Sequence, residues 1–230
     1  MKNKTLLFII LCCTALLYTS KIQAQLSPYV DDKLLHFGFS LSVDILSYNI
    51  EAVEGTPYQP RALALGPGFT VGFITDLRLC NNLNLRFTPA LGFGERTITY
   101  ANTDQPKQSI LTIPISIPLY LKWSAARESI FRPYVIAGGG IQIECFRDKE
   151  KVILHEPFDA FVAGGFGCDF YFKWFKFCPE IKYHIGFLDA HVPTSRTEEE
   201  GWGIGTDKYI YTDAIQRMIH QKISITFNFE

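Results

Sequence analysis

Residues 222–230 alternate between apolar and polar side chains without interruption. Ile223, Ile225, Phe227 and Phe229 fall on one face of an extended chain, and the residues between them are polar. Successive side chains of a strand point to opposite sides of a sheet, so this strand requires an apolar environment on one side and a polar one on the other. The closing strand of an outer-membrane barrel meets that requirement, because lipid lies outside it and the lumen inside.

The same period of two recurs along the chain and predicts eight strands separated by turn residues. They span about residues 35–46, 68–79, 83–99, 111–123, 133–145, 158–172, 177–188 and 222–230. The alternation in residues 111–123 continues through Pro114 and Pro118, and we expect a bulge at each proline because proline lacks a ladder donor. The predicted fold class is all-β, an eight-stranded antiparallel transmembrane outer-membrane β-barrel.

Short and long connections alternate between the expected strands. The short ones cover residues 80–82, 124–132 and 173–176, and the longest covers 189–220. Outer-membrane barrels have tight periplasmic turns and longer outer loops, so this rhythm predicts that both termini are periplasmic. Ala214, Ile215, Met218 and Ile219 have helical spacing, which predicts a short helix that meets a partner or, as we favour, packs on the rim of the barrel.

Residues 1–24 have a basic start, an apolar stretch and a small residue at Ala24, which is the pattern of a secretory signal peptide. We therefore expect a mature barrel domain over residues 25–230, located in the cell outer membrane. Removal of residues 1–24 leaves 19 basic and 23 acidic residues, a net charge of −4. This acidic balance argues against nucleic acid as a partner.

Four cysteines remain outside the signal peptide: Cys80, Cys145, Cys168 and Cys178. Their spacing contains no CxxC pair and no cluster with histidine, so we expect neither a metal site nor a cofactor. Disulfides are compatible with export, but no two of these cysteines fall on obviously opposed strand positions. We expect free thiols that pack against lipid or in the lumen.

The polar face of each strand predicts the content of the lumen. The interior of an eight-stranded barrel is only wide enough for side chains to fill, and charges removed from water must be paired. We therefore predict an interior polar network without a pore. Its members are Asp44, Asp76, Arg78, Arg86, Lys122, Gln142, Glu144, Asp169, Glu180, Lys182 and His184.

His36, Ser40 and Asp44 share the lumen face of the first strand and suggest a hydrolytic triad. Residues four apart on a strand are about 13 Å apart, however, which is beyond hydrogen-bond reach. A hydrolase would instead need His36 or His184 within hydrogen-bond reach of one of four serines on the lumen faces. These serines are Ser40, Ser42, Ser116 and Ser224.

The segment Asp32-Lys33-x-x-His36-Phe37-Gly38-Phe39 resembles the start of the PorT family, and residues 223–230 resemble that family's closing strand. PorT proteins are small outer-membrane barrels required for the type IX secretion system, which exports cargo such as surface proteases. The resemblance therefore implies a secretion role without a known enzymatic step. Asp32, Lys33 and His36 are expected to form a polar plug or a contact at the periplasmic edge.

Three functions follow as hypotheses. The first is a non-enzymatic component of type IX secretion that contacts outer-membrane lipid or lipopolysaccharide and other secretion components. The second is an outer-membrane hydrolase acting on lipid A or acyl chains. The third is an OmpA-like structural or adhesion barrel, whose function would depend on the loop 189–220 and not on secretion.

Overall fold

The computed structural model describes residues 33–55, 59–62, 66–101, 108–127, 130–145, 155–192, 212 and 214–230. The expected signal peptide and Asp32 lie outside these ranges. Within them the chain forms eleven antiparallel strands. The described residues contain no helix that is long and apolar enough to cross a membrane. The strands are β1 (Leu35–Ala52), β2 (Gln59–Ala62), β3 (Gly66–Arg78), β4 (Leu83–Phe87), β5 (Ala90–Ala101), β6 (Gln108–Thr112), β7 (Pro114–Ser124), β8 (Phe131–Glu144), β9 (Phe158–Tyr171), β10 (Lys176–Gly186) and β11 (Ile215–Phe229).

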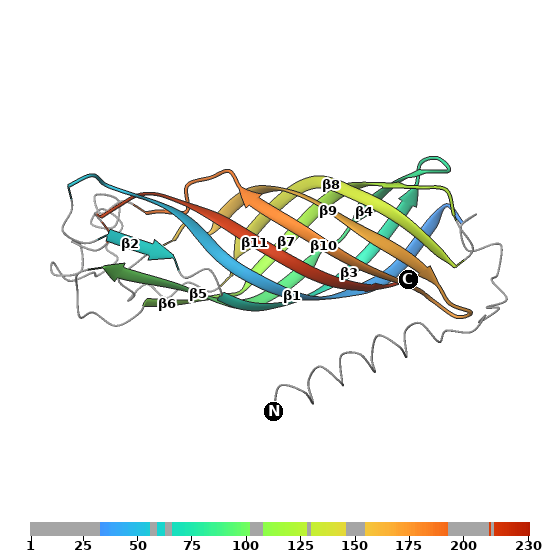
Figure 1. Cartoon of the computed structure of the whole chain (residues 1–230), viewed down its shortest axis with the longest axis horizontal. Helices are drawn as coiled ribbons and strands as arrows, with labels where there is room; N and C mark the ends of the chain where they lie inside the picture. The colour runs from blue at the N-terminus through green and yellow to red at the C-terminus, as the bar shows by residue number, and fades with distance from the viewer. Residues whose placement is uncertain are drawn as a thin grey trace, which may run out of the picture.

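The strands close into an elongated barrel with eight positions around its ring (Figure 1). β1 pairs with β3 on one side and with β11 on the other, which closes the ring. From β11 the order runs through β10, β9, β8 and β7 to β4 and β5, which share one position and both pair with β3. β6 pairs with β5 and leads into β7, and β2 pairs with the end of β5. The predicted eight-stranded antiparallel barrel is confirmed.

Several expected elements differ from the structure, including the first and last strands, which are longer than expected. The strand expected over 83–99 is divided at Thr88 and Pro89 into β4 and β5. The helix expected over Ala214–Ile219 is wrong, because β11 begins at Ile215 and pairs there with β1. The register shifts where Ala52 faces Ile215, so Ile215 and Met218 both point inward despite lying three residues apart. A bulge thus produced the apolar spacing that resembles a helix.

The two prolines of β7 are accommodated without the expected bulges. Pro114 faces Glu144 and Pro118 faces Gly140 in one unbroken register with β8. On the other side of β7, Pro118 lies opposite the interruption between β4 and β5, where the Thr88 N–H donates to its carbonyl oxygen at 3.4 Å. Because proline has no N–H, it is tolerated where the neighbouring ladder is already interrupted.

The two ends of the barrel differ in their connections. At one end lie the start of β1, the end of β11 and the short β3–β4, β7–β8 and β9–β10 connections; we call this the turn end (Figure 1). At the opposite end, called the loop end, β1, β5 and β11 continue beyond their neighbours and β2 is added (Figure 1). The alternation of short and long connections follows from this arrangement.

An apolar band surrounds the barrel next to the turn end. Along β7 the burial alternates residue by residue, with Ile115 and Trp123 among the exposed apolar side chains and Lys122 buried. On β1 every outward position from Leu35 to Ile45 is apolar. Ten steps of about 3.3 Å, tilted by about 40°, give a band about 25 Å high, which is the height of the lipid-facing band of outer-membrane barrels.

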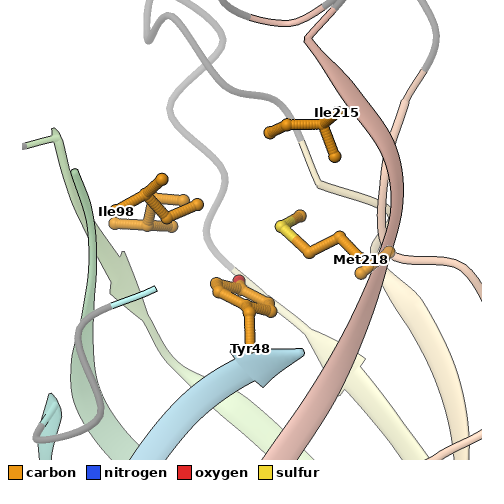
Figure 2. Packing of buried hydrophobic residues seen from close by; sticks show 6 residues of the cluster. Tyr48, Ile98, Ile215 and Met218 are labelled. Carbon is orange, nitrogen blue, oxygen red and sulfur yellow. The ribbon is translucent and has the colours of Figure 1, made fainter. Parts of the chain in front are cut away.

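Beyond Ile45 the two faces of the wall exchange polarity. The outward positions of β1 become polar, as at Ser47 and Glu51, while the inward positions become apolar, as at Leu46 and Tyr48. The inward side chains form a hydrophobic core at the loop end, which contains Tyr48, Ile98, Ile110, Ala190, Ile215 and Met218 (Figure 2). This part of the barrel therefore has the polarity of a water-soluble protein, and it extends past the lipid-facing band.

Candidate functional site: the interior of the barrel

A cluster of ion pairs fills the interior near the turn end. Arg86, from β4, donates to Asp76 at 2.8 Å and also to Glu180 and Glu230. The side chains of all four residues are at most 1% exposed. The Tyr134 hydroxyl donates to Glu180 at 2.7 Å. Each acidic member thus accepts from a cation, as the burial of charge demands.

Three lysines complete this cluster. Lys122 donates to Asp169 at 2.8 Å, Lys182 contacts Glu180 at 2.7 Å, and Lys176 contacts Glu230 at 2.5 Å. Together with Arg86 they give four cations, which face the four carboxylates of Asp76, Asp169, Glu180 and Glu230. The side-chain charges of this turn-end cluster therefore balance. It comes from strands on all sides of the ring, so it fills the cross-section of the lumen.

The middle of the lumen is lined by hydroxyls. Ser42 donates to Asp44 at 2.8 Å, and Thr70 donates to the same carboxylate. Ser224 lies 3.4 Å from Nε2 of His184. These side chains line a cavity of about 30 Å³, which has room for water but none for an acyl chain. The middle of the lumen therefore contains a small polar cavity, and the turn-end cluster lies between this cavity and the turn end.

The interior changes to an apolar core through Arg96. Its guanidinium contacts Glu144 at 3.5 Å and lies over the Tyr48 ring, 5.0 Å from the centroid. Gln142 donates to Glu144 at 3.0 Å. Tyr48 lies above the lipid-facing band, and burial raises the pKa of its hydroxyl to about 12, so it remains neutral beside Arg96.

The structure places the predicted network residues at three levels of the barrel. Those of the turn-end cluster are Asp76, Arg86, Lys122, Asp169, Glu180 and Lys182; Asp44 and His184 lie in the middle; and Gln142 and Glu144 lie toward the loop end. Arg78 differs, because it lies at the rim of the turn end and donates to Asn81 at 2.8 Å. Arg78 is the last residue of β3, where the wall no longer encloses its side chain.

Among the described residues, five charged residues of the interior were absent from the predicted set: Arg96, Asp159, Lys176, Lys222 and Glu230. Lys222 and Arg96 each lie an even number of residues from a side chain already assigned to the lumen on the same expected strand. The period of two could therefore have identified them. Lys176 and Glu230 flank strand ends, where parity does not establish whether a side chain turns inward. Glu230 does so because its backbone pairs with Lys176, through N···O distances of 2.7 and 2.9 Å.

The suspected triad is not assembled. His36 lies at the turn end and faces Asp76 of β3, whereas Asp44 lies further along β1 and accepts from Ser42 and Thr70. Ser224 and His184 do meet, from neighbouring strands β11 and β10. His184 Nδ1 has no hydrogen-bond partner among the described residues, so no carboxylate orients its ring.

The four cysteines outside the expected signal peptide form no disulfide. Cys80 and Cys145 are exposed, Cys168 is half-buried and Cys178 is buried, and all four are free thiols. Across the described ranges, no group of three histidine, cysteine or acidic side chains is arranged to hold a metal ion.

The signature residues lie together where β1 begins. Lys33 is exposed just before β1, His36 is half-buried, and Phe37 and Phe39 face outward in the lipid-facing band. Gly38 lies directly on the end of β11, since a Cβ there would collide with the carbonyl oxygen of Phe229. The described signature residues thus surround the point at which the first and last strands meet.

Comparisons with known proteins give a family match and similar solved structures. The profile of a family described as "Outer membrane protein beta-barrel domain" matches residues 23–192. No curated protein matches the chain. Among solved structures, the Neisserial surface protein A has 10% identity and a TM-score of 0.44, covering 85% of this chain and 98% of its own. The outer membrane protein OprG from Pseudomonas aeruginosa has 11% identity and a TM-score of 0.46, with coverages of 85% and 91%.

Proposed function

Because the chain belongs to the outer membrane protein beta-barrel domain family, we propose that it acts in the outer membrane as a sealed, non-enzymatic component of type IX protein secretion. The observation that carries this proposal is the turn-end cluster, in which four cations and four carboxylates fill the lumen. The resemblance of residues 32–39 to the PorT family supports the choice of secretion system.

A sealed barrel cannot conduct its cargo, so its contribution must come from its outer surface and rims. An eight-stranded barrel has an interior only wide enough for side chains, and a folded surface protease cannot pass through it. The chain therefore supports secretion by contacting other secretion components or by assisting their assembly. In this proposal the turn end faces the periplasm and the loop end faces outward, as the connection lengths favour.

The test is deletion of the gene followed by comparison of cargo at the cell surface and in the periplasm. We expect surface cargo to fall and periplasmic cargo to accumulate, and a plasmid copy of the native chain to restore export. Unchanged export would overturn the proposal and favour an OmpA-like structural barrel. In that case, trimming the long β10–β11 connection should impair adhesion instead.

Hydrolysis is the second candidate function, and the contact between Ser224 and His184 is the observation behind it. The distance of 3.4 Å lies near the limit of a hydrogen bond, and the adjoining cavity of about 30 Å³ is too small for an acyl ester. We therefore expect Ser224→Ala to leave both lipid A acylation and cargo export at native levels. Lipid A mass spectrometry checks this expectation. Lipid A that retains an additional acyl chain in the variant would instead establish an enzyme.

A further inference from the structure

A cavity of about 330 Å³, which we call the notch, lies at the turn end of the barrel. One wall comes from the start of β1, whose opposite edge pairs with β3. The other wall comes from the β9–β10 hairpin, and Glu230 lies at the floor. The notch therefore lies between the first strand and this hairpin.

The notch is built by close packing at its floor. Because Gly38 has no side chain, β1 approaches the Phe229 carbonyl directly, and the Glu230 backbone is held by Lys176 on the other side. The end of β11 is thus fixed between its two neighbours. The walls of the cavity come from residues 33–37 and residues 171–175. These walls have a cationic part and an apolar part.

One part of the lining is cationic. Lys33 and Lys173 line opposite walls, and both residues are exposed. The floor carboxylate of Glu230 is already paired with Arg86 and Lys176, so it does not neutralise them. Every described carboxylate with an exposed side chain lies toward the loop end of the barrel. Among the described residues that line the notch, three lysines (Lys33, Lys173 and Lys176) therefore outnumber the one acidic side chain of Glu230, and this lining favours an anionic group.

The other part of the lining is apolar and continuous with the lipid-facing band. Phe37 is 57% exposed, Phe172 and Phe175 stack with ring centroids 5.0 Å apart, and Trp174 is 85% exposed. The Lys173 ammonium lies 5.3 Å from the Trp174 ring. Aromatic residues with nearby cations are typical of the level at which headgroups meet acyl chains. A ligand of this notch must have a charged part and an apolar part.

We propose that the notch binds an anionic phospholipid, whose phosphate lies between Lys33 and Lys173 and whose acyl chains lie along Phe37 and Phe175. The lipid-facing band already brings phospholipid to this position. A protein strand added in the notch fits less well, because the Phe172 N–H bonds to the Phe175 carbonyl within the hairpin and that wall therefore closes on itself. The proposal gives the signature residues Lys33 and Phe37 a ligand-binding role.

Tryptophan quenching tests the proposal directly. The chain has three tryptophans, and the variant W123F/W202F leaves Trp174 as the single fluorophore. It is reconstituted in phosphatidylcholine vesicles that contain either brominated phosphatidylglycerol or brominated phosphatidylcholine at equal fraction. We expect stronger quenching by the brominated phosphatidylglycerol. A lysine near an anionic headgroup changes the affinity about fivefold, so K33Q/K173Q should reduce the relative affinity roughly 25-fold and abolish the preference.

The matched control removes two charges at the opposite end of the barrel, with R61Q/R217Q, and should keep the preference. Heat-modifiable migration on a gel verifies that each variant is folded. Equal quenching by the two lipids in the parent, or an unchanged preference in K33Q/K173Q, would overturn the proposal and leave the notch to a protein strand. Loss of the preference on adding soluble glycerol phosphate would also overturn it, because the site would then recognise a free phosphate ester.

Discussion

Arg86 is the residue on which the interior of the turn end converges. Its guanidinium is the common partner of Asp76, Glu180 and Glu230, which come from β3, β10 and the residue after β11. Removing one partner of a buried ion pair leaves an uncompensated charge, which costs more than the pair itself contributes. The single arginine therefore matters more to stability than any one of its carboxylates.

We predict that Arg86→Met lowers the free energy of unfolding by about 3–5 kcal/mol, because three buried carboxylates lose their shared cation. Urea unfolding of the refolded barrel in phosphatidylcholine vesicles measures this loss. Arg78→Met is the control, since Arg78 lies at the rim, and its expected effect is within about 0.5 kcal/mol. Equal unfolding midpoints for Arg86→Met and the parent would contradict the central role of Arg86.

Gly38 provides the second prediction at this scale. A methyl group at position 38 would collide with the Phe229 carbonyl oxygen, so Gly38→Ala should destabilise the barrel by about 1–3 kcal/mol. Gly164→Ala is a matched control in another strand, because the nearest atom to its added Cβ is the Ile136 carbonyl oxygen at 3.9 Å. The two urea midpoints are compared, and similar values would argue against close packing between β1 and β11.

At the scale of elements, β1 and β11 each have two environments along their length. Between the turn end and the level of Ile45, their outward side chains face lipid. Between that level and the loop end, their inward side chains form the hydrophobic core. The core depends on the bulge at the start of β11, which turns Ile215 inward beside Met218 (Figure 2). These strands therefore extend past the membrane because they have a second surface to bury.

Met218→Ala should remove part of this core and lower the free energy of unfolding by about 2–5 kcal/mol. Met218 is fully buried, whereas the next residue, Ile219, points outward on the same strand. Ile219→Ala is therefore the control, with an expected change of about 0.5 kcal/mol. Guanidinium unfolding of both variants in the same detergent makes the comparison, and a larger effect at Ile219 would refute the inward core.

At the scale of the whole molecule, the barrel combines a lipid-facing wall, a neutral ionic filling and an apolar core at one end. The ionic filling lies within the lipid-facing band and the apolar core lies beyond it. Water and ions therefore meet two successive obstacles along the axis. This arrangement suits a protein that acts through its surface.

The purified barrel is expected to produce no conductance steps in a planar bilayer, because the turn-end cluster fills its cross-section. A porin of sixteen strands, measured under the same conditions, provides the positive control. Stable single-channel steps that scale with the amount of the barrel would contradict a sealed lumen and the role proposed from it.

The sequence alone determined which side of the wall most residues occupy. In an extended strand the direction of a side chain depends on parity, so the alternation in 111–123 and 222–230 was sufficient to assign lumen and lipid faces. Parity failed where the backbone was irregular, as at the bulge of β11, or where a strand ended, as at Arg78 and Glu230. The polarity exchange after Ile45 explains why the first strand was expected to end six residues before Ala52.

Only the tertiary structure decided which charges meet and where the notch lies. Arg86 and Glu180 are 94 residues apart in the chain, and their contact depends on the register of strands across the whole ring. The notch likewise depends on the stagger that places the start of β1 beside the β9–β10 hairpin. Alternation specifies the two faces of a strand, but closure of the barrel sets the stagger between strands, and that stagger determines these contacts.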